Sequence, residues 1–320
     1  MRLWLTSVLQ RLLESYHVYL CQYQRQNGRL PLLPDLLGHS RNEGAEFTPV
    51  SLTFDDGNSI QFRKFYPILA ELDINATFYV VTSQIGKPGK MTWDELRELH
   101  ARGNEVGSHT HTHPHLTTLP ISELDLELKR SKSLLEPFGC TTLAYPFGEY
   151  NDRVVESAKR YYTAARSYHN LITRDRDVGY NHRLTREIYA LKVFPTERPL
   201  PLQSHALLDL STSVFRKTIR QLVERAIQEN AWLIFVFHGT SDMSPRNVVD
   251  SVRKKFSETI NRTRDPRRLK NDLIHYYGGV QANKFEWMCQ YLINRSDVRT
   301  LPISRVIQRW DPSEAPEVER

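Results

Sequence analysis

Short apolar runs alternate with helical patterns along most of this chain. Seven runs have the length and composition of β-strands, and the last is the most continuously apolar. They span residues 48–54, 75–81, 104–109, 141–146, 161–167, 189–194 and 231–238. Amphipathic helical patterns occupy residues 62–69, 91–103, 122–139 and 211–229. This alternation predicts an α/β fold with parallel strands.

Two parallel architectures fit the alternation, a closed barrel and an open, doubly wound sheet. Open sheets that bind dinucleotides or phosphates carry a Gly-rich loop after the first strand. No such loop follows residues 48–54, so the sequence favours the barrel. A chain of 320 residues, 40% of them hydrophobic, can bury a core of the size that a barrel needs.

The first 45 residues are expected to form a helix and a linker outside the main domain. One face of this helix is apolar at every fourth position, through Trp4, Val8, Leu12, Tyr16 and Leu20. Gln10 and Arg11 interrupt the apolar run and no A-x-A-like cleavage site follows, which argues against a signal peptide. The helix would pack on the body or a partner subunit, or lie on a membrane surface. We expect the main domain over residues 46–310 and a tail over 311–320.

No run reaches 18 apolar residues, so we expect no membrane span, and a cytoplasmic location with peripheral membrane contact as an alternative. Basic residues exceed acidic ones by 43 to 37, and the surplus gathers in a basic insertion at about residues 250–275. That insertion could contact a phosphate, an anionic glycan or a membrane surface. Nucleic acid is not expected, because no binding motif accompanies the charge. The three widely spaced cysteines, Cys21, Cys140 and Cys289, fit small buried residues.

Titratable residues stand where several predicted strands end. Asp55 and Asp56 follow the first strand, His109 closes the third and His238 closes the last. The carboxyl ends of barrel strands converge on one face, where barrel enzymes carry out chemistry. Packing alone explains such a convergence poorly, so the sequence predicts an enzyme.

The stretch "GSHTHTHPHL" (107–116) places four histidines at alternate positions. Pro114 disfavours a helical backbone at His113, so His109 and His113 are expected on an irregular turn. His111 is expected to point away from them, and His115 to support the site or to be merely structural.

Four motifs in this order resemble the polysaccharide deacetylase family, also called the NodB homology domain or carbohydrate esterase family 4. They are "TFDDG" (53–57), "HTHTH" (109–113), "YPFG" (145–148) and the apolar strand that ends in His238. The resemblance implies a distorted (β/α)7-type barrel and metal-dependent removal of acetyl groups from sugars. It implies that Asp56, His109 and His113 bind the metal and that Asp55 is the general base. It also implies that His238 is the general acid and that the backbone N–H of Phe147 holds the oxyanion.

The chemistry of these residue types agrees with that division. Two neutral imidazoles and one carboxylate leave a zinc-like ion open positions for water and a substrate oxygen. A second carboxylate, free of the metal, can take the proton of the water, and an imidazolium can protonate the leaving amine. The metal is expected to be zinc, with cobalt, nickel and manganese as alternatives.

The chain departs from the family at two points. Ala144 stands where many members carry an arginine that faces the catalytic aspartate, and no Asp-Trp segment supports the acid histidine. Arg166, at the end of the fifth predicted strand, is a candidate to replace that arginine. We therefore expect an acylated amino sugar as substrate, in a saccharide or a glycoconjugate, without inferring chitin or peptidoglycan.

Alternative interpretations exist for each motif. Asp-Asp-Gly and "YPFG" are also typical of turns, and a lone histidine at a strand end is often structural. Two histidines and a carboxylate form the facial triad of non-haem iron oxygenases as well, although that site needs neither Asp55 nor His238. The remaining alternative is an inactive carbohydrate-binding relic of the same fold, against which the intact Asp55 argues.

Overall fold

A computed structural model describes residues 47–167, 180–182, 188–195, 212–239 and 280–309 of the 320. The predicted N-terminal helix, the basic insertion and the tail lie outside these residues. The domain boundaries proposed from the sequence therefore stay predictions.

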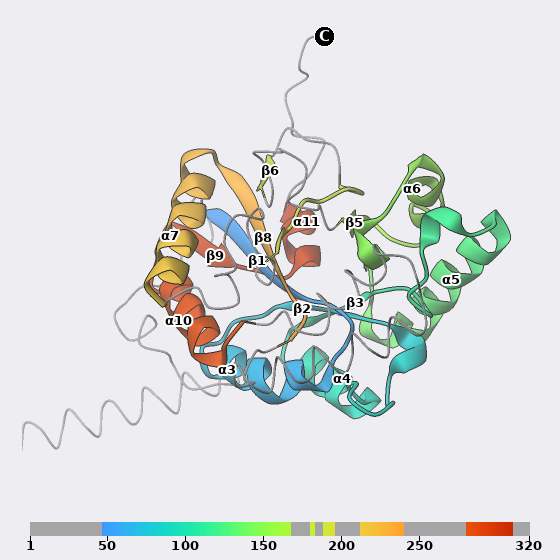
Figure 1. Ribbon diagram of the computed structural model, residues 1–320, viewed down its shortest axis with the longest axis horizontal. Helices are drawn as coiled ribbons and strands as arrows, with labels where there is room; N and C mark the ends of the chain where they lie inside the picture. Colours follow the sequence, from blue (N-terminus) through green and yellow to red (C-terminus); the bar gives the residue numbers. More distant parts are fainter. Residues whose placement is uncertain (1–46, 168–179, 183–187, 196–211, 240–279, 310–320) are drawn as a thin grey trace, which may run out of the picture. The chain divides into compact units, whose positions relative to one another are not determined.

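One curved sheet forms the centre of the described part, and its strands are mostly parallel (Figure 1). The strand order is β5-β4-β3-β2-β1-β8-β6, with β9 beside β1 and β7 beside β8. The strands are β1 (Thr48–Phe54), β2 (Thr77–Val80), β3 (Glu105–Ser108), β4 (Thr142–Ala144), β5 (Ala164–Arg166), β6 (Tyr180–His182), β7 (Phe194–Pro195), β8 (Ala231–Phe237) and β9 (Val298–Thr300).

Residues 188–195 link the two ends of the curved sheet. Leu191 forms a parallel bridge with Arg166 of β5, and its N–H donates to the carbonyl of Ala165 at 3.1 Å. A few residues later, β7 pairs with β8 in parallel, Phe194 opposite Phe235. The order β1 to β5, then this segment, then β8 makes seven parallel positions. This confirms the predicted distorted barrel.

Six of the seven predicted strands form where the apolar runs lie, and one prediction was wrong in its extent. The run at 189–194 forms a strand only at its end, because residues 188–190 turn beside β5 before the chain crosses to β8. Two strands of three residues each, β6 and β9, were not predicted from the sequence, and β6 runs antiparallel to β8.

Helices flank the strands. The four predicted patterns form helical segments, whereas the helices over residues 152–158, 282–293 and 303–309 were not predicted from the sequence. They are α3 (Tyr66–Glu71), α4 (Trp93–Ala101), α5 (Ile121–Leu134), α6 (Asp152–Ala158), α7 (Thr212–Gln228), α10 (Ala282–Ile293) and α11 (Ile303–Arg309). Short π or 3₁₀ segments occupy Gln61–Phe65, Thr82–Gln84, Leu116–Thr118, Glu136–Phe138 and Pro146–Gly148. A capping box between Thr92 and Glu95 starts α4, and Gly103, at φ +88°, follows its end.

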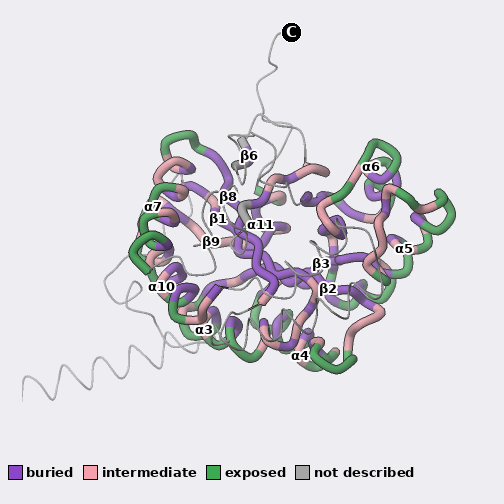
Figure 2. Tube along the Cα trace, viewed as in Figure 1, coloured by how far each residue is buried: buried purple, intermediate pink, exposed green. Residues whose placement is uncertain are grey.

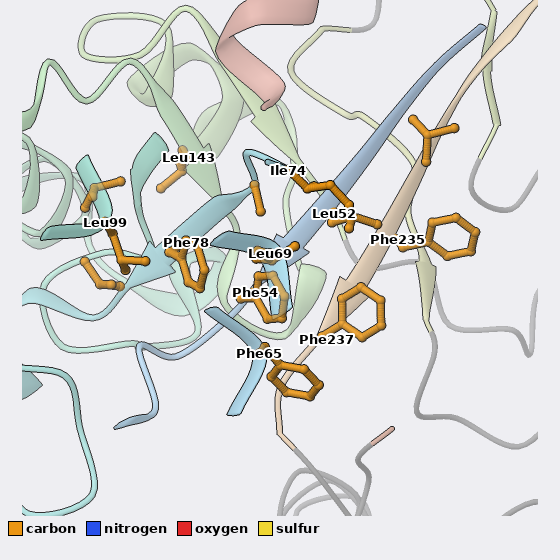
Figure 3. Close-up of a cluster of buried hydrophobic side chains, with 14 of the residues drawn as sticks. Leu52, Phe54, Phe65, Leu69, Ile74, Phe78, Leu99, Leu143, Phe235 and Phe237 are labelled. Atoms are coloured by element: carbon orange, nitrogen blue, oxygen red, sulfur yellow. The ribbon is translucent and has the colours of Figure 1, made fainter. Parts of the chain in front are cut away.

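Successive side chains of a strand point to opposite faces of the sheet, and this alternation divides the core into two clusters. Odd-numbered residues of β8 join an outer cluster with side chains of the helices, such as Phe65 of the π-helical segment and Leu99 of α4. Figure 3 shows part of this outer cluster around Phe54, Phe78 and Phe237. Even-numbered residues of β8 join an inner cluster with Tyr79 of β2 and residues of α11. Figure 2 shows the strands buried and the outer surfaces of the helices exposed.

Replacing Gly107 by alanine tests the packing of the inner cluster. A Cβ at Gly107 would lie 2.5 Å from two ring atoms of the buried Tyr79. We expect Gly107→Ala to lower the free energy of unfolding by about 1–3 kcal/mol, the usual cost of overpacking a core. Chemical unfolding measures this value. Adding Tyr79→Leu should recover part of the loss, and an additive double variant would contradict the assigned contact.

Two further observations concern the described residues. None of the helices found there combines the length and apolar character that crossing a membrane requires. Cys140 and Cys289 are free and buried, as expected, and burial raises the pKa of the Cys140 thiol to about 12.

Candidate active site

Four polar side chains follow the inner-facing alternation at the carboxyl ends of the strands. Successive side chains in a strand point to opposite faces, and the even-numbered residues of β8 are inner. His238 continues that series after β8 ends. Asp55, His109 and Arg166 have the same inner register at the ends of β1, β3 and β5, and all four are at most 5% exposed. The sheet thus gathers residues that are up to 183 positions apart, at one end of the barrel.

Pairing between β1 and β8 brings Asp55 beside His238. The N–H of Asp55 donates to the carbonyl of Phe237 at 2.9 Å, which continues the ladder past both strands. Oδ2 of Asp55 then lies 3.7 Å from Nε2 of His238. The amide of Gln61 donates to the backbone carbonyls of Asp55 and His238, at 2.5 and 2.9 Å. Gln61 therefore ties together the two strand ends that carry these side chains.

Arg166 lies against the other oxygen of Asp55. Its Nη2 donates to Oδ1, and both side chains are almost fully buried. The guanidinium also sits over the ring of Tyr79, with 4.7 Å between its Cζ and the ring centroid. Arg166 is the residue that the sequence offers as a candidate replacement for the arginine missing at Ala144, and in the structure it contacts Asp55.

Asp56 points to different partners from its neighbour. Its backbone is left-handed, at φ 71°, a conformation that aspartate tolerates better than most residues. Oδ1 of Asp56 lies 3.7 Å from Nε2 of both His109 and His113. One donor atom from each of these three residues lies within 4.8 Å of the other two. The turn after β1 thus gives each aspartate its own set of neighbours.

The segment that carries the histidines is an irregular turn after β3, as Pro114 indicates. Thr110 and His113 have left-handed backbones, and the hydroxyl of Thr110 accepts from the N–H of His113 at 3.0 Å. Glu127 of α5 accepts from the N–H groups of His111 and Thr112, at 3.1 and 2.8 Å. These bonds fix a turn in which residues four apart face the same carboxylate.

A backbone carbonyl sets the tautomer of His109. Its Nδ1 lies 2.8 Å from the carbonyl oxygen of Ala144, which can only accept a hydrogen bond, so Nδ1 carries the proton. Nε2, which faces Asp56, is left with its lone pair. Metal-binding histidines are oriented in this manner by a bond from the second ring nitrogen.

The other two histidines of the stretch do not join the Asp56 cluster. Nδ1 of His111 is bonded to the hydroxyl of Thr82 at 2.9 Å. Nδ1 of His115 is 2.8 Å from Oε2 of Glu149, and its ring stacks on Phe147. The expectation that two of the four histidines face one carboxylate agrees with this geometry.

Burial and charge favour neutral imidazoles beside an ionised carboxylate. Burial, with some help from neighbouring His113, lowers the pKa of His109 to about 3 although Asp56 opposes the shift. Burial also lowers the pKa of His113. Burial alone would raise the pKa of Asp56, but nearby positive charges outweigh it, with His238 the largest contributor, and lower that pKa. These protonation states are the ones in which imidazole and carboxylate bind a metal.

Phe147 lies at the edge of this cluster, in the turn Pro146–Gly148 after β4. Its backbone is left-handed, with φ 59° and ψ 2°. The ring meets His113 edge-on, with 4.6 Å between centroids. The structure thus places the predicted oxyanion donor in a constrained turn beside a predicted metal ligand.

Several residues that shape the site were not predicted from the sequence. Gln61 ties the strand ends, Tyr79 underlies Arg166, and Glu127 holds the histidine turn. Lys90 donates to the carbonyl of Asp56 at 3.0 Å and to Oδ1 of Asn58 at 2.8 Å. Each comes from another part of the chain and belongs to a common residue type, so no local spacing marks it. Gln61 is the one exception among them, because a polar residue directly before the apolar positions of a helical pattern is a weak indication of a role in the site.

The described geometry provides two chemical functions side by side. A buried carboxylate contacts a guanidinium and lies near an imidazole, and a second carboxylate shares one point with two neutral imidazoles. The first set can exchange protons, and the second can hold a cation.

Comparisons with known proteins confirm the resemblance seen in the motifs. Residues 43–165 match the family model described as polysaccharide deacetylase. A putative polysaccharide deacetylase of Bacillus subtilis, YxkH, is 27% identical over 140 residues, which cover 42% of this chain and 50% of that protein. Peptidoglycan-N-acetylglucosamine deacetylase PgdA of Listeria monocytogenes is 33% identical over 111 residues, 33% of this chain and 23% of that protein. The chain therefore spans half or less of the length of these relatives.

The Streptococcus pyogenes deacetylase PplD in complex with acetate aligns with a TM-score of 0.42 at 26% identity. The alignment covers 58% of this chain and 81% of that one.

Proposed function

We propose, from the premise that residues 43–165 of this chain belong to the polysaccharide deacetylase family, that it is a metal-dependent hydrolase. It removes an N-acetyl or another short acyl group from an amino sugar. Asp55 acts as the base and His238 as the acid, while Asp56, His109 and His113 hold the metal.

The observation that carries the proposal is that the two adjacent aspartates face different partners. Asp55 faces Arg166 and His238, whereas Asp56 faces His109 and His113. An amide hydrolase of this kind needs one carboxylate that binds the ion and another that is free to take a proton. A binding module would need only the first.

The residues present fit a divalent metal. Asp56, His109 and His113 supply three donors around one point, and burial keeps the imidazoles neutral. The set of two nitrogens and one oxygen suits zinc, and Co²⁺, Ni²⁺ and Mn²⁺ accept the same donors. When bound, the ion would supply a Lewis acid that polarises the acyl carbonyl and makes water acidic enough to react near neutral pH.

The residues of the chain then divide the proton transfers. The Asp55 carboxylate accepts a proton from the attacking water, and Arg166 keeps that carboxylate ionised and oriented. His238, 3.7 Å from Asp55, donates a proton to the departing amine. The N–H of Phe147 donates to the oxygen that becomes negative as the acyl carbon turns tetrahedral.

An acylated amino sugar is the substrate class that these relatives support. The matched proteins include a peptidoglycan-N-acetylglucosamine deacetylase and, at 34% identity over 106 residues, chitin deacetylase 1 of Cryptococcus neoformans. We keep polymeric, lipid-linked and soluble acceptors as alternatives, and formyl beside acetyl. The basic insertion, which would favour an anionic substrate, lies outside the described residues.

Metal analysis combined with a screen for acyl release tests the proposal. The purified protein should contain about one divalent ion per chain and release acetate or formate from at least one acylated amino sugar of a panel. A metal-bearing protein that releases neither would favour the inactive carbohydrate-binding relic. Oxygen-dependent substrate oxidation with bound iron would favour a facial-triad oxygenase.

Replacing Arg166 tests its role in positioning Asp55. We expect Arg166→Ala to lower kcat by about 10- to 100-fold, part of the usual contribution of a general base. The acidic limb of the pH–rate profile should move to higher pH, because a carboxylate that loses a neighbouring cation binds a proton more readily. Arg166→Lys keeps the charge but loses the planar stack on Tyr79, so its kcat should lie between those of wild type and Arg166→Ala. Unchanged activity and pH dependence in Arg166→Ala would remove Arg166 from the site.

A further inference from the structure

Phe147 holds a backbone conformation that its side chain disfavours. A left-handed backbone, here φ 59°, is uncommon for residues other than glycine and strained for bulky ones. Such strain persists only where the surroundings hold it. The side chain contacts around Phe147 therefore indicate what keeps its N–H in place.

His115 covers one face of the Phe147 ring. The two rings are nearly parallel, with 4.0 Å between centroids and 11° between planes. His113 meets the same ring edge-on at 4.6 Å and 71°. The Phe147 side chain is thus fixed between two histidines of the turn that also carries predicted metal ligands.

Glu149 fixes the orientation of the His115 ring. Its Oε2 lies 2.8 Å from Nδ1 of His115 and comes from the same turn as Phe147, two residues further on. One loop therefore holds the His115 ring by both a stacked face and a carboxylate. An exposed polar pair alone contributes little to stability, and the Glu149 side chain is 44% exposed. Here the pair acts on a ring that is already stacked, so its effect is geometric.

We propose that His115 and Glu149 form a clamp that keeps the Phe147 backbone left-handed and aims its N–H at the acyl oxygen. This inference rests on the proposed function, in which that N–H stabilises the oxyanion. His115 and Glu149 are positioning residues in this scheme, since they act through Phe147. They are expected to change the rate of the chemical step and to leave metal and substrate binding unchanged.

Substitutions of His115 separate this role from a structural or a binding one. His115→Ala removes both the stack and the hydrogen bond, and should lower kcat by about 10- to 100-fold with KM within about twofold. A lost oxyanion donor costs about 10²- to 10³-fold, and a misaimed donor should cost part of that. His115→Phe keeps a stacked ring and should recover most of the wild-type kcat. Glu149→Ala should have a kcat between those of wild type and His115→Ala. His111→Ala is the matched control from the same turn and should behave as wild type.

Two readouts keep the clamp distinct from the proposed function. The metal content of His115→Ala should equal that of wild type, and its loss would mean that His115 supports His113 instead. A crystal structure of His115→Ala should show Phe147 outside the left-handed region. A retained positive φ would overturn the clamp even if the wild type released no acyl group. An active wild type with an equally active His115→Ala would overturn the clamp alone, and a rise in KM without a fall in kcat would make His115 a binding residue.

Discussion

Asp55→Asn is expected to abolish acyl release while the protein keeps its metal. Asparagine has nearly the same shape as aspartate but cannot accept a proton from water at neutral pH. Asp55 does not belong to the cluster of Asp56, His109 and His113, so the donors for the ion remain. We expect kcat to fall by about 10²- to 10⁴-fold, the range that general base catalysis supplies. Steady-state kinetics and metal analysis on the same preparation measure both effects.

The matched control is Asp56→Asn, one residue along the chain. This variant should lose metal affinity and activity together, because Asp56 lies 3.7 Å from both imidazoles. Loss of metal from Asp55→Asn, with metal retained in Asp56→Asn, would mean that the two aspartates have exchanged roles. Since Asp55→Asn also leaves the buried Arg166 without its carboxylate, thermal unfolding should accompany the kinetics.

The fold could be predicted where one apolar run forms one strand. Residues 231–238 are buried along their whole length, and residues 48–54 are buried except for Pro49, so the apolar runs mark β1 and β8. The run at 189–194 misled, because its residues serve two different strands in turn. β9 has three residues, only one of them fully buried, and gives no periodic signal.

The site could be predicted as far as its residues stand in short motifs at strand ends. Asp55, Asp56, His109, His113 and His238 were marked by their places after apolar runs. Their supports were not, because Tyr79 looks like any strand residue and Glu149 like any surface acid. What gives them a role is contact with Arg166 and with His115, and such contacts between distant segments follow from the closed sheet.

These supports have a common consequence for how the site is built. Arg166 orients Asp55, the carbonyl of Ala144 orients His109, and Glu127 holds the histidine turn. Each of these interactions joins two different elements of the barrel. The geometry of the proposed site therefore depends on the curvature of the sheet, and so on the packing of the inner cluster.

His109→Ala is expected to release the metal and abolish activity. His109 is 3% exposed, its Nδ1–H is bonded to Ala144, and its Nε2 faces Asp56. Changing even a residue that only orients a ligand costs about 10- to 100-fold in metal affinity, so loss of a ligand should exceed about 100-fold. Titration with zinc into chelator-treated protein measures the change in affinity. Wild type treated with a chelator should lose acyl release and regain it on addition of one equivalent of zinc, and His109→Ala should not regain it.

His111→Ala is the control that separates ligation from the general effect of removing a histidine in this turn. Its ring is bonded to Thr82 and not to the Asp56 cluster, so zinc affinity and turnover should stay near wild type. His109→Gln addresses folding, because a glutamine amide can still donate toward the carbonyl of Ala144 while providing a poor zinc ligand. Stoichiometric zinc in folded His109→Gln, or equal zinc loss in His111→Ala, would contradict the assignment. Either result would place the ion elsewhere than between Asp56, His109 and His113.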